Sequence, residues 1–234
     1  MNITQMMSEA TSLAQEESEA LTRLLTAPTS EPVAQKVIAF YRRMDARMGE
    51  ATEPIACAAG CSYCCYYHVL VTGAEAITLA EHVDRLPEPR RTEVRKAIEQ
   101  TATRVSAMAR EEYLRTNVPC AFLNGGRCSV YSVRPTACRG FHSRDASVCE
   151  EAFDNPLSDP PNQYDPAREA VKIGFKNAVL AAQFRAGADA TSYEMHGAVA
   201  EALKNGSSTK RWRSGKLSFP TVKDRTSIEE MTQQ

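Results

Sequence analysis

Residues 57–65 read Cys57-Ala58-Ala59-Gly60-Cys61-Ser62-Tyr63-Cys64-Cys65, and the interpretation of the whole chain starts from this stretch. A cysteine every three or four residues can fold several thiolates around one point, as a zinc ion or an iron–sulfur cluster requires. The remaining cysteines follow between residues 120 and 149. We therefore expect a metal site whose candidate ligands are Cys57, Cys61, Cys64, Cys65, Cys120, Cys128, Cys138 and Cys149.

Composition excludes several other classes of protein. The formal net charge of −1 over 234 residues provides no basic field, so we expect no nucleic-acid partner. No run of about eighteen apolar residues is present to span a bilayer, and the first ten residues lack the pattern of a secretory signal. We expect a cytoplasmic protein with no membrane partner and with reduced thiols, and this argues against a disulfide framework.

Apolar residues recur at helical spacing on both sides of the cysteine stretches. Thr72-Gly-Ala-Glu75 and Thr191-Ser-Tyr-Glu194 have the form of capping boxes, and Asp165-Pro166 marks a further helix start. Between residues 120 and 149 the helical period is lost. The predicted helices cover approximately residues 13–26, 33–48, 73–86, 90–115, 166–187 and 192–204.

Asn124-Gly125 separates two short apolar runs and predicts a β-hairpin near 120–131, because a tight turn needs positive φ angles. The fold class predicted is mostly α, a helical bundle-like single domain with two cysteine-rich metal-binding loops and this hairpin. We expect four parts: N-terminal helices packing on the core, a cysteine-cluster metal-binding region, C-terminal helices and a flexible tail, over residues 1–50, 52–150, 151–205 and 206–234.

The spacing Cys57-x3-Cys61-x2-Cys64 is also that of radical S-adenosylmethionine (SAM) enzymes, in which three thiolates hold a four-iron cluster. Such enzymes place it after the first strand of a parallel barrel, and this chain shows no series of alternating strands and helices. Cys65 and the four later cysteines also exceed the needs of a three-thiolate site. The sequence therefore disfavours a radical SAM enzyme.

Three segments together resemble the YkgJ-type cysteine-cluster family: residues 57–65, Pro119 to Tyr131, and Arg134-Pro-Thr-Ala-Cys138-Arg139-Gly-Phe141. That family is described as a zinc- or iron-chelating domain with eight cysteines, and the resemblance covers about residues 52–150. It implies metal chelation. Larger relatives include a flagellin lysine N-methylase, so the resemblance also admits a SAM-using enzyme.

Eight thiolates allow two four-cysteine sites, one four-iron cluster with four spare thiols, or one cluster and one zinc. The Cys-x3-Cys-x2-Cys run favours an iron–sulfur cluster over zinc, and SAM is a further candidate cofactor. The function predicted is metal binding in a protein of unknown biological role. The alternatives are a SAM-dependent protein methyltransferase and a metal carrier with a protein client, so catalytic activity stays open.

Other side chains near the cysteines are weaker candidates. His68 and His142 could each complete a site of three cysteines and one histidine, but a histidine hydrogen-bonded within its loop is the favoured interpretation. Arg134 and Arg139 flank Cys138 and are expected to offset thiolate charge rather than to bind an anionic substrate. The three nearby tyrosines are expected to shield the site from solvent: Tyr63, Tyr66 and Tyr67.

Overall fold

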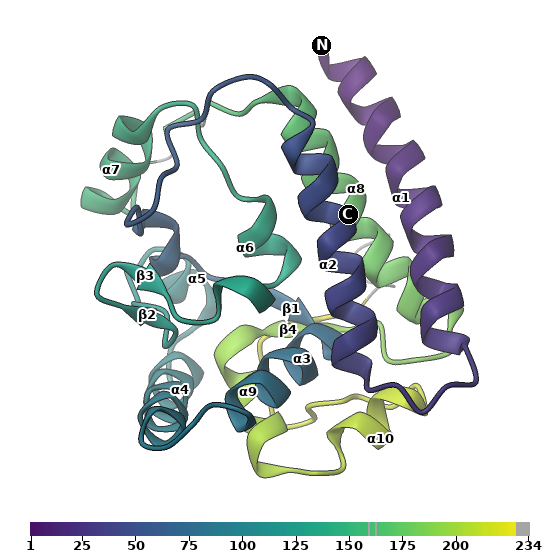
Figure 1. Cartoon of the computed structure of the whole chain (residues 1–234). Coiled ribbons are helices and arrows are strands. Elements are labelled where there is room, and N and C mark those ends of the chain that lie inside the picture. The colour runs from purple at the N-terminus through teal and green to yellow at the C-terminus, as the bar shows by residue number, and fades with distance from the viewer. Residues whose placement is uncertain (159, 162, 228–234) are drawn as a thin grey trace.

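Three long helices form one side of the molecule in the computed structural model, which describes residues 1–158, 160–161 and 163–227. They are α1 (Ile3–Thr26), α2 (Val33–Gly49) and α8 (Pro166–Arg185), which pack against one another (Figure 1). The predicted start of α8 is confirmed, with Asp165 as the cap and Pro166 in the first turn. No helix in the described ranges combines the length and apolar character needed to cross a bilayer.

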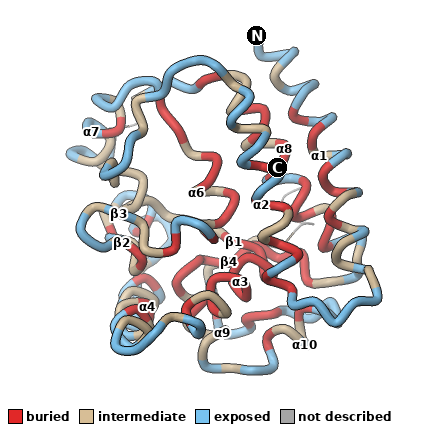
Figure 2. The backbone as a smooth tube through the Cα atoms, in the orientation of Figure 1, coloured by how far each residue is buried: buried red, intermediate tan, exposed pale blue. Residues whose placement is uncertain are grey.

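A second group of helices surrounds α3 (Gly73–Asp84), which packs against α2, α9 (Met195–Lys204) and α4 (Arg90–Ser106). The predicted capping box at its start is confirmed, because Thr72 and Glu75 exchange their hydrogen bonds. Figure 2 shows that buried backbone is concentrated around α3 and the adjacent strands. The mostly α fold class is therefore confirmed.

A small antiparallel sheet, which the sequence did not predict, joins distant parts of the chain. Its order is β1 (Leu70–Thr72), β4 (Ser192–Glu194), β5 (Arg225–Thr226). The capping box predicted to open at Thr191 is wrong, because these residues pair with β1 instead. Glu194 becomes the cap of α9, and its side chain accepts hydrogen bonds from the N–H groups of His196 and Gly197.

The predicted helix over residues 90–115 is two elements, α4 and the short α5 (Arg110–Tyr113). Ala109 adopts an extended conformation between them, and this turn directs Tyr113 into a small apolar cluster with Val105 and Val118. Burial of an aromatic ring outweighs continuation of an exposed helix. The single long helix was therefore a wrong prediction.

The hairpin predicted near 120–131 is confirmed as β2 (Leu123–Asn124) and β3 (Arg127–Cys128), with Gly125 and Gly126 at positive φ. Four short helical elements near the cysteines were not predicted, since each is too short to show a period. They are the 3₁₀ turns η1 (Tyr63–Tyr66) and η2 (Tyr131–Val133) and the helices α6 (Thr136–Gly140) and α7 (Ala146–Asp154).

Residues 207–227 differ from the predicted flexible tail. They contain α10 (Ser208–Arg213) and β5, and Trp212 and Phe219 are buried. The Trp212 indole N–H donates to Gln183 Oε1 at 2.7 Å. Burial of these two rings fixes the segment to the body, and regular structure does not end at residue 206. Residues 228–234 lie outside the described residues.

Candidate metal centre

The two cysteine stretches are joined directly through the backbone. The N–H of Cys120 donates to the carbonyl of Cys65 at 2.8 Å. The hairpin then folds back, so that Cys128 pairs with Leu123 on the neighbouring strand. Cys138 follows in α6, which lies between the hairpin and α2 in Figure 1. Residues far apart in the sequence thereby surround one place in the fold.

Four sulfurs form one group, which we call the hairpin thiols: Cys65, Cys120, Cys128 and Cys138. Burial raises the pKa of Cys138, and the neighbouring Cys120, Cys128 and Cys65 raise it further. Burial likewise raises the pKa of Cys128, which also has Cys120 and Cys65 as charge neighbours. The backbone N–H of Val130 donates to the Cys128 sulfur. Each of these four cysteines is therefore within electrostatic reach of others in the group.

The other four form a second group, the loop thiols: Cys57, Cys61, Cys64 and Cys149. Burial raises the pKa of Cys149, and its charge neighbours include Cys57 and Cys61. The segments are connected near this point, because the Ala56 N–H donates to the Ser143 carbonyl at 2.8 Å. Cys64 has Cys57 among its neighbours but also Cys65 and Cys138, so it lies between the two groups.

The adjacent thiols of Cys64 and Cys65 connect the two groups. Their interaction lowers the pKa of Cys65 and raises that of Cys64. These two adjacent side chains therefore lie where the hairpin thiols and the loop thiols meet.

A cavity of about 860 Å³ opens at the thiols, and every cysteine except Cys149 lines it. Apolar walls come from residues such as Met48, Phe122 and Val130. All eight cysteines have free thiols. Within the described ranges, no three histidine, cysteine, aspartate or glutamate side chains are placed so that they could hold one metal ion. The donor set nevertheless fits a soft metal, because thiolates are the preferred ligands of zinc and of iron–sulfur clusters.

Arg134 and Arg139 have different environments. Arg134 lies within electrostatic reach of Cys65, Cys128 and Cys138, and its guanidinium stacks 3.9 Å from the Tyr131 ring centroid. Its Nε is buried without a hydrogen-bond partner among the residues that the structure describes. This position agrees with the predicted offset of thiolate charge. Arg139 instead binds Asp45 and the Ser132 carbonyl, and so anchors α6 to α2.

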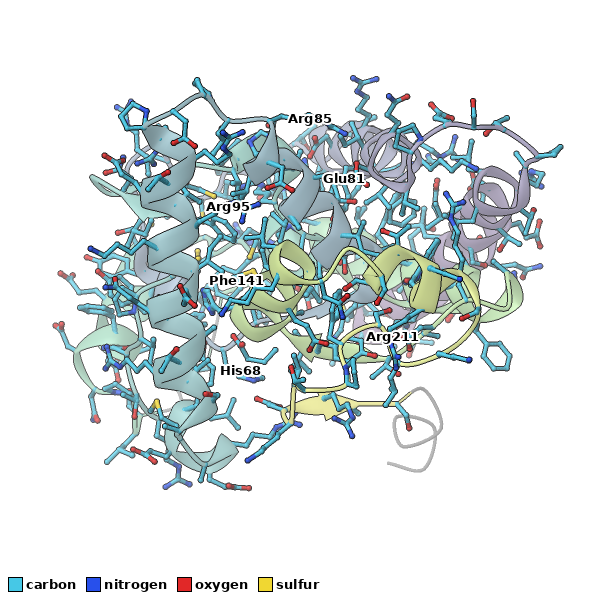
Figure 3. All side chains as sticks on the ribbon, turned by 90° about the horizontal axis from the view of Figure 1, so that it is seen from below. His68, Glu81, Arg85, Arg95, Phe141 and Arg211 are labelled. Carbon is cyan, nitrogen blue, oxygen red and sulfur yellow. The ribbon has the colours of Figure 1, made fainter. Side chains whose placement is uncertain are left out.

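The two histidines considered as ligands have other partners. Nε2 of His68 lies 2.6 Å from Asp224 Oδ2, and its ring packs edge-on against Tyr113. Figure 3 shows His68 beside α4 and near the strand β5. His142 uses both ring nitrogens on backbone, since Nδ1 donates to the Gly140 carbonyl and Nε2 accepts from the Asp165 N–H at 3.1 Å. These contacts agree with the favoured interpretation, in which His68 and His142 are hydrogen-bonded within the protein and are not metal ligands.

The aromatic residues around the first stretch pack on later segments. Tyr63 and Tyr66 contact the Phe153 ring of α7, and Tyr67 contacts Phe141 at 5.5 Å between centroids. Burial raises the pKa of Tyr67 to about 12, and its charge neighbours include Cys149, Cys64 and Cys61. Tyr67 therefore lies against the loop thiols, in agreement with a shielding role.

Comparison with known protein families identifies this region. Residues 56–155 match the model of the CxxCxxCC family, whose description reads "Putative zinc- or iron-chelating domain". We refer to residues 56–155, which are similar to that domain, as the CxxCxxCC domain below. The resemblance seen in the cysteine spacing is confirmed over this segment. Neither the curated proteins nor the solved structures gave a match to the chain.

The CxxCxxCC domain contains all eight cysteines and extends from the loop before Cys57 to the end of α7. One buried residue outside it reaches the hairpin thiols. His196 of α9 accepts a hydrogen bond from the Ala121 N–H at 3.3 Å, and Cys120 is an electrostatic neighbour of its ring. Sequence reasoning missed His196, because it is a single histidine in a helix far from the last cysteine and carries no spacing signal.

Proposed function

We propose that this protein binds metal at two neighbouring positions, one formed by the hairpin thiols and the other by the loop thiols. The observation that carries the proposal is the gathering of seven cysteines around one cavity, with Cys149 beside its edge. A reducing cytoplasm would keep these thiols available for metal. The match to a family described as chelating zinc or iron supports the same conclusion.

An iron–sulfur cluster is the favoured occupant, and zinc is the competing one. A single zinc ion draws four sulfurs to about 2.3 Å from one centre. The seven cysteines that line the cavity exceed the four that one zinc ion needs. A cluster places its ligands around several irons and so accepts a wider spread. Arg134, with its buried and unpaired Nε, would offset part of the negative charge of four thiolates.

Anaerobic purification followed by metal, sulfide and absorption measurements tests this proposal. Iron and sulfide in stoichiometric amounts, with a broad visible band that bleaches on reduction, would support the cluster. Colourless protein with stoichiometric zinc would show that the metal is zinc and not a cluster, and would still support metal binding. Protein that retains neither metal under anaerobic conditions would refute metal binding altogether.

A SAM-dependent methyltransferase is the second candidate, favoured by the same cavity. Binding pockets for small molecules commonly measure about 300–1,000 Å³. The walls combine apolar residues with Arg134, and three of the loop thiols have the spacing Cys-x3-Cys-x2-Cys. Calorimetric titration of SAM into the metal-loaded protein separates the two functions. Saturable heat at micromolar SAM would support the enzyme, and absence of heat would exclude a SAM site in that form.

A further inference from the structure

His196 has an environment unlike that of a histidine that only fills space. It is 1% exposed and lies in the first turn of α9. Nδ1 lies 2.8 Å from Glu194 Oε1, and Nε2 faces the Cys120–Ala121 backbone at 3.3 Å from the Ala121 nitrogen. Both ring nitrogens are thus engaged, and Nε2 accepts from the backbone N–H next to a candidate ligand, Cys120.

The fold brings this histidine to the cysteines through the small sheet. β1 begins five residues after Cys65, and its first residue, Leu70, pairs with Glu194 of β4. The chain then enters α9, where the Met195 N–H donates to the Val69 carbonyl at 3.0 Å. Cys120 is held beside the same segment by its hydrogen bond to Cys65. Three distant parts of the sequence therefore meet at Cys120.

Glu194 fixes the orientation of the ring. Its side chain accepts hydrogen bonds from the N–H groups of His196 and Gly197, at 3.0 and 2.6 Å, and from the Tyr113 hydroxyl. A carboxylate with this many donors has little freedom to move. It holds Nδ1 of His196 on one side and directs Nε2 towards Cys120, an arrangement common behind metal ligands.

We propose that His196, oriented by Glu194, is a positioning residue of the metal centre: by accepting from the Ala121 N–H it holds the Cys120–Ala121 backbone, and with it Cys120, beside the other hairpin thiols. This inference rests on the proposed function, and it adds to the site two residues that lie outside the CxxCxxCC domain. The position of a coordinating sulfur in turn affects the electronic properties of the metal it binds. His196 would therefore influence both metal retention and the spectrum or potential of the loaded protein.

His196→Ala, His196→Gln and Glu194→Gln test the inference, with His82→Ala as the control. His82 lies in the last turn of α3, outside the set of residues that line the cavity at the thiols. The measurements are metal affinity by chelator competition at 25 °C, the absorption spectrum with the midpoint potential if iron is present, and the melting temperature. Each variant is purified anaerobically as the full chain.

We expect His196→Ala to weaken metal affinity roughly 10- to 100-fold and to shift the spectrum or potential. His196→Gln, which keeps a polar group at the position, should recover part of the affinity, and Glu194→Gln should weaken affinity less than the alanine variant does. His82→Ala should leave affinity and spectrum unchanged.

Two outcomes would overturn the inference in distinguishable ways. Wild-type protein that retains no metal refutes the proposed function and this inference with it. Wild-type protein that holds metal while the His196 and Glu194 variants keep its affinity and spectrum refutes only the positioning role. If His196→Ala does not fold, the comparison of His196→Gln and Glu194→Gln with His82→Ala decides the question in the same way.

Discussion

The backbone N–H of Cys120 donates to the carbonyl of Cys65 at 2.8 Å, and this bond joins the two cysteine stretches before any metal is considered. It places the start of the hairpin beside η1, so that Cys128 and Cys138 are brought to the same place as Cys65. A site prepared by backbone contacts requires less ordering when metal binds. The grouping of the thiols is thus a property of the fold.

If metal binds at two separate positions, each single cysteine substitution should empty only one of them. Cys128→Ser should remove the metal of the hairpin thiols, and Cys61→Ser that of the loop thiols, so each variant should keep about half of the wild-type metal. Metal and folding are coupled in such loops, so each should also melt at a lower temperature. Elemental analysis per chain measures the result, with Ser62→Ala as the control. Full metal content in Cys61→Ser would contradict a site at the loop thiols.

Glu75 should be essential for the position of Cys138. Its buried carboxylate accepts hydrogen bonds from Thr72, Tyr41 and both the N–H and hydroxyl of Thr136, which opens α6 two residues before Cys138. In Glu75→Gln, the amide N–H₂ group faces one set of these hydrogen-bond donors and cannot accept from them. We expect a loss of about 1–3 kcal/mol in the free energy of unfolding, measured in urea.

The control for this prediction is Glu81→Gln on the same helix, where the partly exposed carboxylate pairs with Arg85. That change should cost a few tenths of a kcal/mol. Metal content should fall in the Glu75 variant and stay unchanged in the control. Equal stabilities of the two variants would show that the Glu75 network does not hold α6 in place.

Signals that act within four residues were read correctly from the sequence. The Thr72–Glu75 box, the Asn124-Gly125 turn and the Asp165-Pro166 start each depend on the local backbone, and each forms as expected. The cysteines were found as candidates for the same reason, because close spacing itself limits where thiolates can go.

Features that depend on distant partners were not predictable in this way. Thr191–Glu194 has the composition of a capping box, yet it forms a strand because β1 offers it backbone partners far away in the sequence. The division of the thiols into two groups depends on the Cys120–Cys65 bond and on α6, and neither leaves a local signal. His196 reaches Cys120 only through the sheet, so its role could not be seen before the fold was known.

Gly73 should not tolerate the smallest side chain. A methyl group there would lie 2.7 Å from Ser218 Oγ and 2.8 Å from Trp212 Cδ1, both buried in the docked C-terminal segment. Although alanine favours helices over glycine by about 1 kcal/mol, we expect Gly73→Ala to destabilise the protein by about 1–3 kcal/mol. Denaturant unfolding measures this. Gly49→Ala, where the added carbon meets nothing within 4 Å, is the control and should be neutral or stabilising.

The carboxylate of Asp224 should make the stability of the protein depend on pH in the acid range. Burial alone would raise its pKa, but the hydrogen bond with His68 and the charge of Arg110 outweigh burial and hold the pKa below the ordinary value. A lowered carboxyl pKa contributes stability that is fully present above the unfolded-state value of about 4, and this contribution is lost as the pH falls through the lower folded-state value. The contribution should disappear in Asp224→Asn.

We therefore expect Asp224→Asn to melt below the wild type by a constant margin between pH 7 and pH 5, and the margin to close as the pH falls below about 4. The difference in melting temperature between Asp224→Asn and the wild type is taken at each pH. It therefore excludes any effect of acid on metal binding that both proteins share. Asp84→Asn, whose exposed partner is Arg95, should change the melting temperature little at any pH. A margin for Asp224→Asn that stays constant down to pH 3 would show that this carboxylate does not stabilise the C-terminal segment through its charge.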